Sequence, residues 1–336
     1  MASCYREDLF RLFYPNRPTR GPLRVWSPPP DPDRPSLPYL PGFKAHIQSH
    51  VAPAPFRHER LYDSWPREMV SHGELETLTQ NALVVSHPPI EATTAPSDTK
   101  VRSETAQLTI TSQIRGGCEG GAQVVVCTVA KDGEPPFEAV AKIYDALYYR
   151  FSHSVASRVR DVTTEAGKDY TAEAGAYKRL TSVGRASQVT PAYYGSWTFN
   201  LPITSGGVEQ MRPDRLVLIE HLRGSNPKGL RIRNSAELRG DRNAFHFPEE
   251  YRLEVLARAM DAYVRSLHCG VEQNDFADCN VVLCSEDTSI TTHMTGTDIP
   301  RVVLVDYNVA IVYSCTLGGR RAEESSALPV NPMQWF

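Results

Sequence analysis

Three side chains that carry oxygen lie in two short segments near the C-terminal end of the chain. Asp275 and Asn280 are five residues apart before the apolar run 281–283, and Asp306 follows directly after the apolar run 302–305. Two such runs predict neighbouring strands, so we expect the three side chains to meet at the mouth of one hairpin. Carboxylate and amide oxygens are the ligands that a hard divalent cation prefers, and such a cation can bridge to phosphate. The alternative is that Asp275 and Asn280 only cap a turn, where both residue types are favoured.

Lys142 lies inside a further apolar run, at residues 139–143. A lysine in a buried strand is costly unless its charge has a partner. Residues 166–180 carry apolar side chains at helical spacing, and Glu173 is the acid on that stripe, so we expect it to pair with Lys142. Glu165 is the alternative partner, although it lies nearer the helix start, where the helix dipole already favours a carboxylate. The other interpretation of Lys142 is an edge-strand lysine that points to water.

A glycine-rich segment separates two runs that alternate as strands do. The first strand is predicted around residues 108–111 and the second around residues 124–129. Glycines in the turn between them let backbone amides approach a phosphate closely; they are Gly116, Gly117, Gly120 and Gly121. The alternative is an ordinary hairpin turn without a ligand.

Three longer patterns provide the scaffold for these residues. Residues 216–224 are predicted to form a buried strand that ends in a linker, and residues 250–268 a helix with a broad apolar face. Residues 67–85 are a candidate helix within the first hundred residues, which hold 16 of the 26 prolines. Because proline removes a backbone donor and restricts the residue before it, we expect residues 1–104 to form a mostly disordered arm.

With these elements in this order, the chain resembles the protein-kinase-like superfamily. The catalytic loop of that family reads H-R-D-x-x-x-x-N and is followed by D-F-G. Asp275 and Asn280 keep the loop spacing with Q-N before the Asp, and residues 306–308 read D-Y-N. Residues 139–142, A-V-A-K, match the V-A-I-K strand of the family. The chain is similar to divergent kinase-like proteins of filamentous fungi, with a short C-terminal part.

The resemblance implies an α+β fold with two lobes and ATP between them. The N-lobe, a small antiparallel sheet with one helix, would span residues 105–222. An abbreviated, mostly helical C-lobe would span residues 223–316, so that the kinase-like domain covers 105–316 and residues 317–336 form a tail. Backbone groups around Glu220 and Leu222 would hydrogen-bond the adenine edge, and Lys142, held by Glu173, would orient the phosphates beside the glycine turn.

The resemblance also implies roles for the three oxygen-bearing side chains. Asp306 would hold Mg²⁺, and Asn280 would hold a second ion or fix the loop. Asp275 would accept the proton of an attacking hydroxyl, or orient that hydroxyl. Catalysis would then rest mainly on positioning and charge neutralisation, as phosphoryl transfer requires.

Departures from the family pattern leave two function classes open. Asn274 stands where the family has the Arg that contacts a phosphorylated activation loop, the A-P-E motif is absent, and 30 residues follow Asp306. We therefore expect an ATP-dependent phosphotransferase with an unknown acceptor. The alternative is a pseudokinase-type module that binds nucleotide or protein partners without turnover.

Composition argues against some classes of binding partner and indicates a cellular compartment. The net charge of −3 and the pI near 6.4 come without a long Lys/Arg run, which argues against nucleic acid and an anionic membrane surface as partners. No secretory signal and no apolar run of ~20 residues is evident. Seven scattered cysteines predict reduced thiols in an intracellular protein of the cytoplasm or nucleus. A zinc site at Cys269, Cys279 and Cys284 with His268 is a remote alternative.

Overall fold

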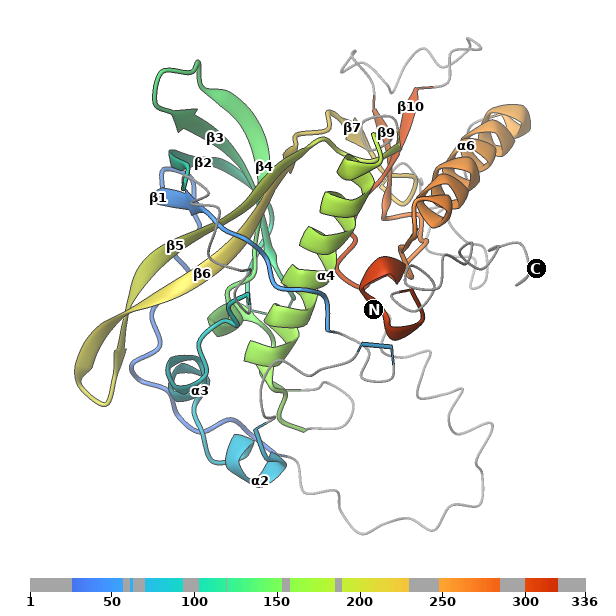
Figure 1. The fold of residues 1–336 in the computed structure, drawn as a ribbon. Coiled ribbons are helices and arrows are strands. Elements are labelled where there is room, and N and C mark those ends of the chain that lie inside the picture. Colours follow the sequence, from blue (N-terminus) through green and yellow to red (C-terminus); the bar gives the residue numbers. More distant parts are fainter. Residues whose placement is uncertain are drawn as a thin grey trace, which may run out of the picture.

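Six antiparallel strands form a closed barrel in the computed structural model of the protein, which describes residues 26–56, 61–62, 70–92, 103–118, 120–152, 158–184, 189–229, 248–284 and 300–319. The order around the barrel is β1-β2-β3-β4-β6-β5. Figure 1 shows the barrel on one side of the molecule and α6 on the other. The strands are β1 (Lys44–Ser49), β2 (Thr105–Arg115), β3 (Gln123–Lys131), β4 (Phe137–Ile143), β5 (Tyr193–Ser205) and β6 (Val208–Glu220).

Alternating side chains explain why these segments become barrel strands. In β2, Ala106, Leu108 and Ile110 are buried while the residues between them are more exposed, which is the period of two that a strand requires. The predicted hairpin around the glycine turn is confirmed, because β2 pairs with β3 in a register that sets Leu108 opposite Val129. The inward side chains of all six strands form one apolar core, in which Trp197 is the largest fully buried residue.

Strand β1 closes the barrel, and it comes from the proline-rich region. It pairs with β2 on one side and with β5 on the other, with Ile47 opposite Ala106 and Gln48 opposite Thr198. Ile47 is fully buried in the barrel core. The expectation of a disordered arm therefore does not apply to this described segment. The single helix predicted at residues 67–85 is not observed in the described part of this range, which instead contains two short helices, α2 (His72–Leu75) and α3 (Gln80–Ser86).

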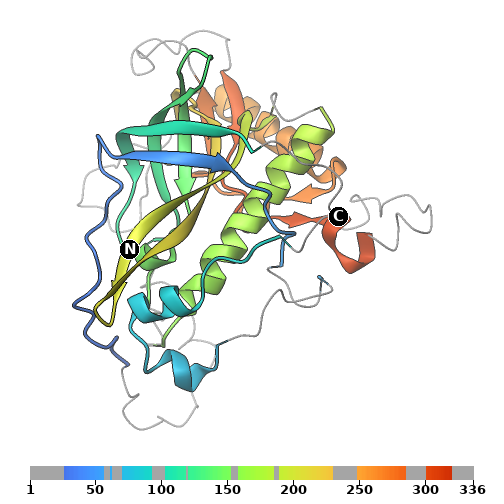
Figure 2. The same ribbon diagram turned by 60° about the vertical axis from the view of Figure 1, so that its left-hand side comes forward.

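Helix α4 (Val162–Ser182) lies between the barrel and the C-terminal part of the chain in both views (Figures 1 and 2). Asp161 is the N-cap residue of this helix. Its carboxylate accepts a hydrogen bond from the Thr164 backbone N–H at 2.9 Å, so one otherwise unpaired donor of the first turn is satisfied. The predicted apolar stripe is buried and includes Ala166, Tyr170 and Tyr177. The helix packs against β5 and β6 of the barrel and against the short strands β8 and β11.

The part of the chain after the barrel combines one long helix with very short strands. Helix α6 (Glu249–His268) matches the predicted helix. A three-stranded sheet has the order β10-β9-β7, from β7 (Gly224–Ser225), β9 (Val281–Cys284) and β10 (Arg301–Leu304), and a second sheet pairs β8 (Val271–Glu272) with β11 (Ile311–Val312). Two 3₁₀ turns complete the elements, η1 (Ala146–Tyr148) and η2 (Tyr313–Cys315). Buried side chains of α4, α6 and both sheets form a second core.

The expected α+β, two-lobed kinase-like fold is wrong. A small antiparallel sheet in an N-lobe was expected, whereas β1 closes the sheet into a barrel by pairing with β2 and β5. A mostly helical second lobe was expected, yet among the described helices only α4 and α6 exceed seven residues. Strand β1 lies within residues 1–104, for which we expected a disordered arm, and the sequence patterns therefore do not predict a closed sheet. No helix in the described ranges has both the length and the apolar composition needed to cross a membrane.

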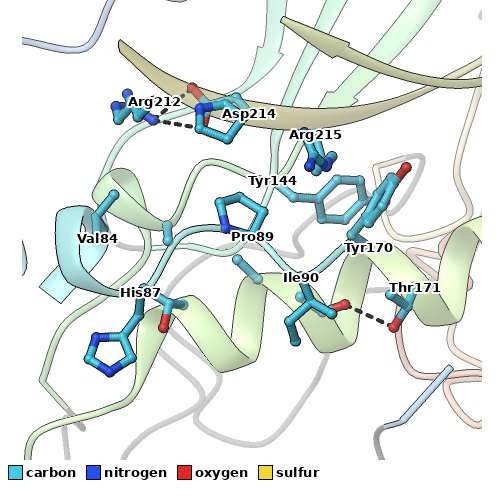
Figure 3. A pocket seen from close by; sticks show the side chains of 15 residues that line it. Val84, His87, Pro89, Ile90, Tyr144, Tyr170, Thr171, Arg212, Asp214 and Arg215 are labelled. Carbon is cyan, nitrogen blue, oxygen red and sulfur yellow. Dashed lines mark hydrogen bonds and ion pairs between the residues drawn. The ribbon is translucent and has the colours of Figure 1, made fainter. Parts of the chain in front are cut away.

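A buried ion-pair cluster anchors β6 to the chain that follows β4. Arg212 donates to both oxygens of Asp145 at 2.8 and 2.7 Å, and to Asp214 at 2.6 Å. The Tyr39 hydroxyl donates to Asp145 at 2.6 Å. Figure 3 shows Arg212 beside Asp214 at the edge of a pocket between β6 and α4. Two buried carboxylates share one guanidinium here, so burial, followed by the charge of Asp145, raises the pKa of Asp214 to about 8.

We predict that Ile47→Ala lowers the free energy of unfolding by about 2–5 kcal/mol, because it leaves a cavity in the barrel core. Val51, which is 60% exposed and follows the same strand, provides the control, and Val51→Ala should change stability by less than about 0.5 kcal/mol. Urea unfolding measures both. Equal stability of Ile47→Ala and wild type would contradict the placement of β1 in the barrel.

We also predict that Asp214→Asn weakens the pH dependence of stability. The raised pKa means that the folded protein holds a proton that the unfolded chain releases, so this contribution is complete below pH 3.8 and is lost as the pH rises through about 8. The wild-type stability should fall across that window with a slope of about 1.4 kcal/mol per pH unit from this group. In Asp214→Asn the slope should shrink, whereas the exposed control Asp261→Asn should retain it. An unchanged slope in Asp214→Asn would contradict the raised pKa of Asp214.

Candidate functional site

Lys142 provides the positive charge at the centre of the site. It lies on β4 between Val124 of β3 and Val217 of β6, and its side chain is buried. Its Nζ donates to Glu173 Oε1 at 2.8 Å and to Asp306 Oδ1 at 2.6 Å. The predicted ion pair between Lys142 and Glu173 is therefore present. The alternative partner, Glu165, is paired with Arg160 instead.

Glu173 is fully buried on α4 and receives hydrogen bonds from two further directions. The Tyr144 hydroxyl donates to its Oε2 at 2.5 Å, and the Tyr307 backbone N–H donates to its Oε1 at 3.4 Å. Burial raises the pKa of Glu173, and the charge of Lys142 opposes that rise. Burial would also lower the pKa of Lys142, but the carboxylates of Glu173 and Asp306 outweigh it and raise that pKa above its ordinary value. Lys142 is consequently held as a cation.

Asp306 is the carboxylate of this cluster that reaches solvent. Its side chain is 27% exposed, whereas that of Glu173 is 0% exposed, so of the two carboxylates only Asp306 can meet a ligand without rearrangement of the core. Burial disfavours its charge, yet the nearby Lys142 more than compensates and lowers its pKa. Its φ of 67° lies in the left-handed region, which costs energy in a residue other than glycine.

The polar segment that holds Asp275 and Asn280 is joined to Asp306 through Val305. The Val305 backbone N–H donates to the Asn280 carbonyl at 2.9 Å, and the Gln273 amide donates to the Val305 carbonyl at 2.5 Å. The hairpin predicted from the apolar runs 281–283 and 302–305 is confirmed, since β9 pairs with β10 in antiparallel register. Asn280 Nδ2 donates to Asp275 Oδ2 at 2.7 Å, which fixes the orientation of an otherwise exposed carboxylate.

Asn274, directly before Asp275, has a φ of 62°. Among the described residues, Asn274 and Asp306 are the only two other than glycine with a positive φ. Asn and Asp tolerate this region better than most residues, but each position still stores strain. Such strain is concentrated at functional sites, and both positions belong to this one.

The glycine turn is fixed by a side chain that the sequence patterns did not reveal. Gly117, with a φ of 111°, donates its N–H to Gln123 Oε1 at 2.9 Å, and Gln123 Nε2 donates to the Gly117 carbonyl at 2.9 Å. The Gly117 amide is thus already paired within the protein. The four predicted glycines line one pocket together with Gln123, Ala122 and Arg115. Their phosphate role stays a prediction.

Glu220 is the last residue of β6, and Leu222 follows two residues later. Glu220 is opposite Ala139, three residues along β4 from Lys142, a spacing of roughly 10 Å. Its backbone N–H donates to the Ala192 carbonyl at 2.8 Å, and its carboxylate accepts from Arg301 at 2.6 Å. Leu222 is half-buried beyond the strand end. Their adenine role also stays a prediction, and Glu220 serves a structural pairing as well.

The oxygen donors of this site suit Mg²⁺ only in part. The described residues contain no group of three or more His, Cys, Asp or Glu that could hold a metal ion, and that includes the cysteines near His268. Asp306 and Asn280 supply hard oxygen atoms, which Mg²⁺ prefers. Because Mg²⁺ is usually held by one or two carboxylates together with phosphate oxygens and water, these two residues fit a cation that arrives with a phosphate ligand.

Tyr144 is a further side chain of the candidate site that we did not predict. It lies two residues after Lys142, so both point to the same side of an extended segment, and this period of two was the signal that could have identified it. Its hydroxyl donates to Glu173 Oε2 and so helps to hold that carboxylate beside Lys142.

We predict that Lys142→Met destabilises the protein by about 3–5 kcal/mol, because it leaves Glu173 buried without its cation. A carboxyl whose folded pKa is raised contributes stability at low pH and loses it as the pH rises through the folded pKa. The loss relative to wild type should therefore be larger at pH 8 than at pH 5 in urea unfolding.

The double variant Lys142→Met/Glu173→Gln is the control for this mechanism. Its neutral amide needs no cation, so most of the stability should return and the difference between pH 5 and pH 8 should largely disappear. A pH-independent loss in the single variant would instead assign the effect to packing.

No protein-family model matches this chain, and no curated protein matches it. Together with the closed barrel and the few long helices, this overturns the assignment to the protein-kinase-like superfamily and to a divergent fungal branch of it. The motifs that suggested the family are a few residues at fixed spacing, and such short patterns do not specify how distant strands pair. What the structure retains is the cluster of Lys142, Glu173 and Asp306.

Proposed function

We propose that the protein binds an adenine nucleotide, as ATP with Mg²⁺, at Lys142 and Asp306, and transfers its terminal phosphoryl group to an acceptor. The observation that carries this proposal is the buried Lys142 between two carboxylates, of which only Asp306 reaches solvent. A lysine fixed in this way is a directed donor to a phosphate oxygen. Both strained non-glycine positions among the described residues border the same place, which supports a ligand site there.

Each residue has a distinct part in the proposed transfer. Lys142 donates to a phosphate oxygen, and Glu173 with Tyr144 keeps its ammonium in position. Mg²⁺, when bound with the nucleotide, neutralises charge that builds up on the phosphate oxygens. Asp306 and Asn280 are the residues that would hold it.

Asp275 acts on the acceptor in this proposal. Its carboxylate is exposed and is oriented by Asn280, so it can accept the proton of an acceptor hydroxyl. The hydroxyl oxygen forms a bond to the terminal phosphorus, the bond from that phosphorus to the bridging oxygen breaks, and ADP leaves with the electron pair. Positioning and charge neutralisation supply most of the rate in reactions of this class.

An interaction module without turnover is the second candidate. Leu253, Leu256 and Met260 share one face of α6 and are 57%, 48% and 52% exposed. Exposed apolar side chains gathered on one helix face are typical of surfaces that bind a partner. Phe276, next to Asp275, is also exposed and packs on Tyr263 of the same helix with ring centroids 5.3 Å apart.

We predict that ATP with Mg²⁺ raises the melting midpoint of the wild-type protein, because a ligand that binds only the folded state stabilises it. ATP with a chelator should raise it less. In Asp306→Asn the metal-dependent part should disappear, whereas the exposed control Asp261→Asn should behave as wild type. No shift in a well-folded wild type would overturn the proposal and favour the interaction module.

Asp275→Asn separates binding from transfer. The variant should retain the ATP-dependent shift and lose release of ADP from ATP by about 10²–10⁴-fold, which is the usual contribution of a general base. Wild-type release of ADP in Asp275→Asn would remove Asp275 from the chemistry. Binding without any release of ADP in the wild type would favour a nucleotide-binding module.

A further inference from the structure

Arg115 is a cation at the rim of the glycine turn that the proposed reaction has not yet used. It is the last residue of β2 and lines the same pocket as the backbone of the four glycines. Within the described part of the chain, its exposed guanidinium has no ion pair or hydrogen bond. Its exposed position at the rim of the pocket makes it accessible to a ligand that enters there.

The turn is shaped to receive this guanidinium. A Cβ at Gly120 would lie 3.2 Å from Arg115 Nη2 and 3.5 Å from its Nε, so any larger residue would press against the arginine. A Cβ at Gly116 would lie 1.8 Å from the Gln113 side chain. Gln123 holds the turn from the opposite side through its two hydrogen bonds with Gly117. Glycine at position 120 thus leaves room for the Arg115 guanidinium against the turn.

Arg115 and Lys142 lie in one cross-strand row of the barrel, because Arg115 is opposite Val124 of β3 and Val124 is opposite Lys142 of β4. Residues directly opposite each other point to the same face of a sheet, and two strand spacings separate these cations by about 10 Å. Lys142 is already balanced by Glu173 and Asp306, so these three residues together offer no net positive charge to an anion. Among the described residues that line the pocket at the glycine turn, Arg115 is the one cation.

We propose that Arg115 and the glycine turn form an anion subsite that binds the terminal phosphate of a nucleoside triphosphate whose inner phosphates lie at Lys142 and Asp306. This inference rests on the proposed function. A guanidinium presents parallel N–H donors that match two oxygens of one phosphate, which a lysine cannot do. Arg115 is accordingly a residue for discrimination between triphosphate and diphosphate.

Calorimetric titration with ATP and with ADP, each with Mg²⁺, tests the subsite without relying on turnover. The wild type should bind ATP more tightly than ADP. Arg115→Gln should weaken ATP binding by about tenfold to a hundredfold, the usual effect of one charge-assisted hydrogen-bond pair, and ADP binding by less than about threefold. Arg115→Lys should give an intermediate ATP affinity, because it keeps the charge and loses the paired donors.

Arg258→Gln, which removes an exposed arginine on α6, is the matched control and should leave both affinities unchanged. Melting midpoints without ligand verify that every variant is folded. If Arg115→Gln leaves the ratio of ATP to ADP affinity as in the wild type, the subsite is overturned and the proposed function stands. If the wild type binds neither nucleotide, the proposed function fails, and the subsite fails with it.

Discussion

One lysine ammonium shared by two carboxylates connects the three parts of this molecule. Lys142 belongs to the barrel, Glu173 to the helix beside it, and Asp306 to the chain that follows β10. A buried charge of this kind needs hydrogen-bonding partners of opposite charge. The positions of α4 on the barrel and of the chain after β10 therefore both depend on contacts with Lys142 Nζ. The Tyr144 hydroxyl and the Tyr307 amide complete the coordination of Glu173. Displacement of α4 from the barrel would separate Lys142 from Glu173 and leave a charge unpaired in the core.

The molecule contains a second cluster of the same composition, and the comparison separates structure from function. Arg212 with Asp145, Asp214 and the Tyr39 hydroxyl also combines one cation, two carboxylates and a phenol. All four of those residues are at most 5% exposed, so the cluster can only hold the fold together. The Lys142 cluster differs in one respect, because Asp306 opens to solvent beside a strained backbone and the oriented pair Asp275 and Asn280. Exposure of a single member makes that cluster a candidate ligand site.

The site is assembled from turns whose shapes are fixed by side chains rather than by regular structure. Gln123 clamps the glycine turn, and Gln273 with Asn280 attaches the loop before β9 to Val305. Asn274 and Asp306, which border these contacts, adopt the left-handed backbone region although neither is glycine. The surrounding hydrogen bonds offset the energetic cost of this conformation. The functional groups are therefore preorganised even though the strands that carry them contain only two to four residues in the C-terminal part. Preorganisation of this kind favours chemistry that depends on position and charge.

Local information in the sequence was sufficient for the two long helices, the β2–β3 hairpin, the β9–β10 hairpin and the pairing of Lys142 with Glu173. Each follows from periodicity or from the cost of a buried charge, and both are properties of nearby residues or of one residue type. Only the tertiary structure decided that β1 closes the barrel, because that strand has one fully buried side chain, Ile47, and lies in a proline-rich region. Its two neighbours, β2 and β5, are distant in the chain, and local patterns do not specify such pairings. The same limitation made the family resemblance misleading, since spacing within short motifs is compatible with both an open sheet and a closed barrel.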